Sequence, residues 1–331
     1  MIKMILFFVA VVAGVVALFF VVSPRPAEKI TWGVNFSHKH ARDMGLDWRQ
    51  TYLAILDDLG ANNIKLLTHW DLLEPSKDNY YFDDLDWQIE EVKKRDAKVI
   101  LVMGMKTGRW PECHLPDWAQ SLSKEEQQKE VLELIESVVL RYRDSKAISR
   151  WQSENEPFFP FGSCPWSDED FVKKEIDLIK RLDAQKRPVI VSDTGEFSLW
   201  IKPGRLGDVV GTTLYRRVWS KEFGTYVNLP FPPSFYRSKA KFIEKVFGKK
   251  VIVVELQAEP WGPKLLYDSP LQEQAKSMNL EQLRKNVEFA QKTGFDEFYL
   301  WGAEWWHWMK ERQGDSKVWE EVKKLFIKSE L

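Results

Sequence analysis

The 331-residue chain is 44% hydrophobic and 29% charged, a composition that predicts a folded globular protein and excludes a disordered or collagen-like chain. Its 48 Lys and Arg residues nearly balance 49 Asp and Glu residues, so the formal net charge of −1 provides no basic excess for binding nucleic-acid phosphates. The 16 tryptophans are unusually many, and their flat rings serve either as core side chains or as surfaces on which ligands stack.

The amino terminus is the most apolar part of the chain. Residues 4–22 carry no charge, and a helix of this length can cross a hydrocarbon layer about 30 Å thick. The segment is longer than the apolar core of a typical signal peptide, and no A-x-A pattern precedes Pro24. We therefore expect residues 1–24 to form an N-terminal transmembrane anchor helix, with a cleaved signal or a buried helix as the alternatives. With an anchor or a signal, residues 25–331 would lie outside the cytoplasm, either membrane-anchored or secreted.

Short apolar runs recur along residues 25–331, and each is followed by a loop and then by apolar residues at helical spacing. Most runs are continuous aliphatic stretches, which is typical of parallel strands covered on both faces. Strands are expected at Thr31–Phe36, Asn63–Leu67, Lys98–Met103, Ile148–Gln152, Pro188–Ser192, Val209–Leu214, Val251–Glu255 and Glu297–Trp301. Helices are expected at Trp48–Leu59, Leu85–Arg95, Lys124–Tyr142, Asp168–Leu182, Ser234–Phe247, Asn279–Thr293 and Lys317–Ile327, several of them ending at a glycine (Gly60, Gly248 and Gly294).

The alternation of strands and helices predicts an α/β fold, a single (β/α)8 TIM barrel, because eight such units close a barrel and no Pro/Ser/Gly-rich linker divides the segment. A doubly wound open sheet is the alternative. Its usual phosphate-binding motifs, G-x-G-x-x-G after the first strand and G-x-x-x-x-G-K-[ST], are not found in the sequence. We expect one catalytic or binding domain over residues 25–331, and a monomer.

In such a barrel the functional site lies where the strands run into their following loops. These positions are rich in polar and aromatic side chains, and they include all five histidines of the chain. A mixture of hydrogen-bonding groups and flat apolar faces suits an oligo- or polysaccharide ligand. The binding candidates are Asn35, His69, Trp70, Arg109, Trp110, Glu304 and Trp305.

Two glutamates at strand ends point to a reaction. The triplet Asn155-Glu156-Pro157 follows the fourth predicted strand, and Glu255 ends the seventh, which lies nearly opposite in a ring of eight. Cleavage of a glycosidic bond needs one carboxylic acid to protonate the leaving oxygen and a second carboxylate to attack or to activate water. The pair therefore predicts a glycoside hydrolase.

This pattern resembles glycoside hydrolase clan A, the retaining (β/α)8 enzymes whose acid/base follows an Asn on strand four and whose nucleophile ends strand seven. The resemblance covers residues 30 to about 310. It implies a double displacement with Glu156 as acid/base and Glu255 as nucleophile, whose carboxyl groups would lie about 5–5.5 Å apart. It also implies Asn155 as a donor to the sugar 2-hydroxyl, Tyr215 as the residue that positions the nucleophile, and Trp301 as a sugar platform.

The sequence departs from family 5 of the clan on two strands. Family 5 cellulases usually carry Arg on strand two and His-x-Tyr on strand six, where this sequence has Lys65 and Thr213-x-Tyr215. The family within the clan is therefore not assigned. Glu154 and Glu259 remain alternative catalytic residues.

The only two cysteines, Cys113 and Cys164, follow strands three and four. In an exported protein we expect them to form a disulfide between neighbouring loops, with two free thiols as the alternative.

A metal or cofactor is not expected. His38-x-His40 with His69 or His114 has possible ligand character, but hydrogen bonding to a sugar or packing is the preferred interpretation, so we assign neither. Two other functions stay open, namely a carbohydrate-binding pseudoenzyme barrel and a metal-dependent barrel hydrolase.

Overall fold

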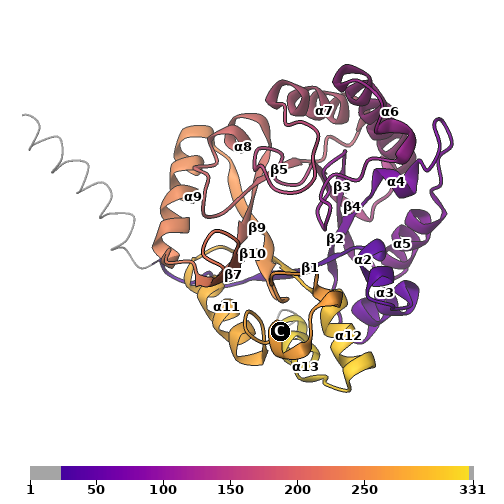
Figure 1. The fold of residues 1–331 in the computed structure, drawn as a ribbon. Coiled ribbons are helices and arrows are strands. Elements are labelled where there is room, and N and C mark those ends of the chain that lie inside the picture. Colours follow the sequence, from indigo (N-terminus) through magenta and orange to yellow (C-terminus); the bar gives the residue numbers. More distant parts are fainter. Residues whose placement is uncertain (1–23, 328–331) are drawn as a thin grey trace, which may run out of the picture.

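A computed structural model describes residues 24–327 of the chain (Figure 1). Its parallel strands form a closed barrel in which neighbours along the chain are neighbours in the ring. The open-sheet alternative is therefore wrong, and all eight predicted strands are confirmed with ends shifted by at most two residues. The barrel strands are β1 (Thr31–Phe36), β2 (Asn63–Leu67), β3 (Lys98–Met103), β4 (Ile148–Ser153), β5 (Val189–Asp193), β6 (Val209–Leu214), β9 (Lys250–Gln257) and β10 (Glu297–Trp301).

Helices surround the barrel, as Figure 1 shows. All seven predicted helices are present, whereas the 11-residue α12 was not predicted. Several have recognisable ends: a capping box of Ser123 and Glu126 begins α6, and Gly248, with φ of 66°, ends α9. The helices are α2 (His38–Asp43), α3 (Trp48–Asp57), α4 (Trp70–Leu73), α5 (Asp83–Lys94), α6 (Lys124–Tyr142), α7 (Glu169–Leu182), α8 (Ile201–Leu206), α9 (Pro233–Phe247), α10 (Leu271–Gln274), α11 (Leu280–Lys292), α12 (Ala303–Gln313) and α13 (Lys317–Ile327).

One pair of strands was not predicted. After β6 the chain forms an antiparallel hairpin of β7 (Arg217–Ser220) and β8 (Thr225–Asn228), which stands apart from the barrel sheet. Its strands are only four residues long, too short to show a period of hydrophobicity.

The interior of the barrel is closed at the amino-terminal ends of the strands. Arg150 of β4 pairs with Glu297 of β10, which lies on the opposite side of the ring, and the second contact of this pair, Nη2 to Oε2, is 3.2 Å. Lys250 of β9 and the hydroxyl of Tyr299 also donate to the Glu297 carboxylate, each over 3.2 Å. We call these four residues the cross-brace. They leave the carboxyl ends of the strands as the open mouth.

The predicted anchor lies outside the described residues. Within residues 24–327, no helix has the length and apolar character needed to cross a membrane.

Candidate active site

Glu156 and Glu255 meet at the mouth of the barrel. Thr213 of β6 is paired in register with Glu255 of β9, and its hydroxyl donates to Glu156 Oε1 over 3.0 Å. Both glutamates are buried, with 9% and 3% of their surfaces exposed. A single threonine therefore joins the two candidate catalytic residues in one pocket.

The carboxylate of Glu255 is fixed by two donors. Lys65 Nζ lies 3.2 Å from one oxygen, and the hydroxyl of Tyr215 lies 3.0 Å from the other. Burial lowers the pKa of Lys65, an effect that the charge of Glu255 opposes, and burial together with the same charge raises the pKa of Tyr215 well above 10. Tyr215 is thus a neutral donor at any ordinary pH, and it occupies the position that the resemblance gave it.

Lys65 also contacts Asn155, the residue before Glu156, and so links Glu255 to the segment that carries Glu156. Its ammonium group lies 3.2 Å from Asn155 Oδ1, which accepts a second hydrogen bond of 3.2 Å from Gln152. Both contacts use the carbonyl oxygen of the side-chain amide. The NH2 group of Asn155 is therefore the part that can donate to a ligand.

The surroundings of Glu156 favour its protonated form. Burial raises the pKa of this carboxyl well above its usual value, and the negative charge of Glu255 raises it further. Its backbone is held by Ser192, whose hydroxyl accepts from the amide over 2.9 Å, and by Lys106, whose Nζ lies 2.9 Å from the carbonyl oxygen. A carboxyl group with a raised pKa next to a second carboxyl group is the arrangement that glycosidic cleavage requires.

The structure separates Glu154 from this pair. Its carboxyl group accepts from the backbone amides of Met105 and Lys106, over 2.9 and 2.5 Å, and shares a hydrogen bond with buried Glu175. Glu154 and Glu156 have φ of 57° and 45°, so the backbone leaves the regular strand conformation and sends their side chains to different partners. Glu154 holds the loop after β3 in place.

Glu259, the other alternative, belongs to a buried ion cluster. Arg109 pairs with Glu259 through Nη1 and with Glu304 through Nη2, the latter at 2.6 Å, and Glu304 accepts from the Ser37 amide over 2.6 Å. The Arg109 guanidinium lies over the Trp301 ring, 4.3 Å from its centroid. One face of the predicted platform is thus covered by Arg109, Lys65 Nζ lies 5.7 Å from the centroid of the same ring, and only 5% of Trp301 is exposed.

Three predicted binding residues lie in the core. Trp70 and Trp305 are 0% and 2% exposed, and their indole N–H groups donate to side chains within the protein, over 2.8 Å in each case. Asn35 is fully buried and donates to main-chain carbonyls of β9 and β10. For Trp70 and Trp305 the expected contact with substrate is wrong, because both rings are part of the hydrophobic core. The Asn35 side chain instead joins β1 to β9 and β10 by hydrogen bonds.

The remaining candidates divide by exposure. His69 is buried with both ring nitrogens engaged, Nε2 at 2.8 Å from the Ser37 hydroxyl and Nδ1 at 3.4 Å from that of Thr107. Burial lowers its pKa well below 6.5, so the ring is neutral. Trp110, in contrast, is 52% exposed and can contact a ligand directly.

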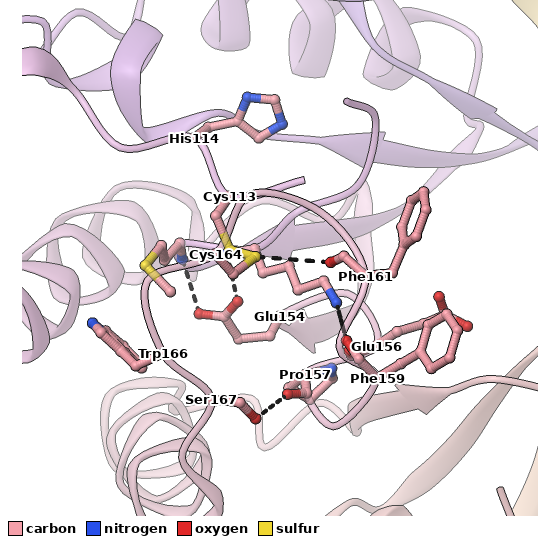
Figure 2. Close-up of a disulfide and its surroundings, with 12 residues drawn as sticks. Cys113, His114, Glu154, Glu156, Pro157, Phe159, Phe161, Cys164, Trp166 and Ser167 are labelled. Atoms are coloured by element: carbon pink, nitrogen blue, oxygen red, sulfur yellow. Dashed lines mark hydrogen bonds between the residues drawn. A yellow bond between two sulfur atoms is a disulfide. The ribbon is translucent and has the colours of Figure 1, made fainter. Parts of the chain in front are cut away.

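The predicted disulfide is present. Cys113 and Cys164 are bonded, and they join the loop after β3 to the loop after β4, as Figure 2 shows. Beside it, burial raises the pKa of Glu112 to about 8, and the charge of Glu255 contributes in the same direction. The sequence reasoning did not single out Glu112 as a binding residue, since a loop glutamate carries no signal of its burial.

Two more residues of the pocket, Lys65 and Thr213, were noted only as departures from a family pattern. For Lys65 a signal existed, because a lysine inside a buried strand requires an anionic partner.

Among residues 24–327, one group of side chains has oxygens close enough together to hold a metal ion, namely Glu74, Asp78 and Glu130. Its oxygens already accept from Trp70, the Asp78 amide and Lys77, so internal contacts account for the group.

No family model matches the sequence, and no curated protein matches it. Solved structures do match. A cold-adapted β-galactosidase from Rahnella sp. R3 is 14% identical with a TM-score of 0.61, over 93% of this chain and 57% of the other. A GH5_18 protein from Streptomyces cattleya, in complex with GlcNAc, is 13% identical with a TM-score of 0.58, over 83% and 70%. A family 10 endo-β-1,4-xylanase from Gloeophyllum trabeum is 15% identical with a TM-score of 0.54, over 83% and 85%.

These neighbours are (β/α)8 barrels of clan A, so the fold that the resemblance predicted is confirmed. The chain spans between 50% and 60% of the length of four β-galactosidases that it matches.

Proposed function

We propose that the protein is a retaining β-glycoside hydrolase in which Glu156 is the acid/base and Glu255 is the nucleophile. The observation that carries the proposal is the contact of Thr213 with Glu156 beside its register partner Glu255, because it brings a buried carboxyl group with a raised pKa close to a second buried carboxyl group. The glycoside hydrolases among the structural neighbours support the same class of reaction.

The reaction proceeds in two displacements. Glu255 attacks the anomeric carbon while Glu156 gives its proton to the departing glycosidic oxygen, so an alcohol leaves and a glycosyl ester forms on Glu255. Esterification removes the charge of Glu255, one of the causes of the raised pKa of Glu156. Glu156 then accepts a proton from water, the water attacks the anomeric carbon, and the sugar leaves with its original configuration. The proposed mechanism predicts a carboxyl separation of about 5–5.5 Å.

The substrate is proposed to be an oligo- or polysaccharide or another β-glycoside. Asn155 would donate to the sugar 2-hydroxyl, and Trp301, which is 5% exposed, would contact the sugar ring. We further propose that the chain acts as a monomer outside the cytoplasm, anchored through residues 4–22; the disulfide supports an oxidising compartment. Protease treatment of intact cells tests this location, since an external domain is digested and an internal one is protected.

Labelling with 2-deoxy-2-fluoro β-glycosides tests the nucleophile. Peptide mass spectrometry should find the sugar on Glu255. A label on Glu259 would reassign the nucleophile, and binding of glycosides without labelling or turnover would favour the pseudoenzyme alternative.

Azide rescue tests both roles with a matched pair of variants. With an activated aryl glycoside, Glu255→Gly should yield the α-glycosyl azide, because azide attacks in place of the nucleophile. Glu156→Ala should yield the β-glycosyl azide, because azide attacks the glycosyl-enzyme in place of water. The same configuration from both variants would contradict the assignment.

A further inference from the structure

A row of aromatic side chains runs outward from the catalytic pair. Phe161 lies 6.2 Å from Phe159, and Phe159 lies 6.3 Å from Phe197, measured between ring centroids, with ring planes only 17° and 10° apart. Phe161 also contacts Trp110 at 6.4 Å and Trp261 at 5.4 Å. We call these five residues the aromatic row.

The row is tied to both glutamates. The Phe159 amide donates to the Glu156 carbonyl oxygen over 3.0 Å, and Lys106 Nζ donates to the carbonyl oxygens of both residues, over 2.9 and 2.7 Å. Trp261 packs edge-on against Tyr215, which donates to Glu255. Figure 2 shows the rings of Phe159 and Phe161 extending to the same side of their loop as the Glu156 carboxyl group. The row therefore has a fixed position relative to the reacting groups.

Both ends of the row are open to solvent. Phe197 is 68% exposed and Trp110 is 52% exposed, although burial of such rings is strongly favourable. Three of the five members are phenylalanines, which offer no hydrogen bond, whereas a subsite for a sugar combines a flat ring with polar groups. The chemistry of the row thus fits a hydrocarbon better than a sugar.

The position beside Glu156 identifies which part of a substrate would lie there. The acid/base protonates the leaving oxygen, so the leaving group departs on the side of Glu156, whose carbonyl oxygen accepts from the Phe159 amide. The nearly parallel rings of Phe161, Phe159 and Phe197 succeed one another in a line, which suits an extended chain.

We propose that the aromatic row binds a linear hydrocarbon leaving group, so that the substrates of this site are alkyl or lipid β-glycosides. The inference rests on the proposed function. In the reaction, the bond between the anomeric carbon and the glycosidic oxygen breaks, Glu156 supplies the proton, and the hydrocarbon leaves as an alcohol; water later releases the sugar from Glu255.

The test is a series of alkyl β-glycosides of one sugar, from methyl through butyl and octyl to dodecyl, at concentrations below micelle formation. A first screen of methyl and nitrophenyl glycosides selects the sugar. The value of kcat/KM should rise with chain length, by up to about fourfold for each methylene that is buried. The variant Phe197→Ser should flatten this dependence at the longer chains, where its ring is reached.

Phe223→Ser is the matched control, because Phe223 is 76% exposed in the turn between β7 and β8 and is no part of the row. It should leave the dependence on chain length unchanged. An equal loss in both variants would mean that exposed rings bind detergent-like molecules in general, and would overturn the proposal. So would a rise in rate that occurs only above the micelle-forming concentration.

Binding separates this inference from the proposed function. Calorimetric titration of the protein with dodecyl and methyl glycosides should show tighter binding of the longer chain, which Phe197→Ser abolishes. Hydrolysis of methyl glycosides with no effect of chain length would refute the hydrocarbon site and leave the hydrolase intact. Chain-dependent binding without hydrolysis of any glycoside would keep the site and refute the hydrolase, and failure of both would refute both.

Discussion

Glu255 owes its orientation to two hydrogen bonds, and one of them can be removed without changing the shape of the pocket. Tyr215→Phe deletes the hydroxyl that donates to Glu255 over 3.0 Å. A hydrogen bond to a charged group contributes about 1.5–3 kcal/mol, so kcat should fall about 10- to 150-fold while the melting temperature stays near that of the parent. Tyr226→Phe is the control, since it deletes a similar bond to Glu273 in the hairpin and should leave kcat unchanged.

Glu156 should make the protein less stable as the pH rises. Burial, and then the charge of Glu255, raise its pKa in the folded state, so the folded protein binds a proton that the unfolded chain has already lost. The contribution is fully present below the unfolded pKa of about 4.3 and is lost as the pH rises from there through the folded pKa.

Glu156→Gln has no such proton to lose. The melting temperature of this variant, relative to the parent, should therefore be higher at pH 8 than at pH 5. Glu281→Gln, at a side chain that is 77% exposed, should show no such gain. An equal difference at both pH values would contradict the raised pKa.

At the level of single residues, sequence reasoning selected two glutamates that lie close together at the mouth, but it could not tell which side chains are buried. The Asn-Glu-Pro triplet was enough to prefer Glu156, but the left-handed backbone that turns Glu154 away leaves no trace in residue type. Trp70 and Trp305 were misassigned because a tryptophan at a strand end can either line a pocket or fill the core, and only the packing of neighbouring helices decides which.

The loops after β3 and β4 act as one unit, because the Cys113–Cys164 disulfide closes a loop across 51 residues. Constraint of the unfolded chain by a loop of this length stabilises the fold by up to about 4 kcal/mol. The double variant Cys113→Ser/Cys164→Ser should melt at a lower temperature, and it should lose activity before it unfolds because Glu112 and Arg109 lie on the freed loop. A reducing agent should affect the parent in the same way and the variant not at all; equal effects on both would exclude the disulfide as the cause.

Whole elements were predicted well where hydrophobicity is continuous. Both faces of each barrel strand are buried, so the continuous aliphatic runs predicted the ends of β3 correctly and those of β9 to within two residues. The 11-residue helix α12 was missed because its buried residues are consecutive, 303–307, and not at helical spacing. The short helices α2, α4, α8 and α10 and the hairpin were missed, because segments of four to six residues do not complete two turns or several alternations. These short elements surround the mouth, so the part of the fold that was hardest to predict is the part that shapes the site.

The cross-brace lies at the amino-terminal ends of the barrel strands, and the candidate active site lies at their carboxyl ends. Glu297→Gln should lower the free energy of unfolding by about 1–3 kcal/mol, because Arg150 and Lys250 lose the carboxylate that both contact. This loss is smaller than the loss expected for a fully buried ion pair, because the Arg150 side chain is 23% exposed. Denaturant unfolding measures this loss, and kcat at 25 °C should be unchanged. Glu244→Gln, in an exposed pair with Arg237, should cost less than about 0.5 kcal/mol. A fall in kcat for Glu297→Gln would show that the two ends are coupled.

The cross-brace has a consequence for laboratory evolution. The cross-brace contributes to heat resistance at the end of the barrel opposite the mouth, whereas the loops at the mouth decide the choice of substrate, so substitutions at the cross-brace can be selected without changing the site. A library diversified around Arg150, Lys250 and Glu297 could be enriched for heat resistance first, and the survivors could then serve as parents for remodelling the loops without repeating that search.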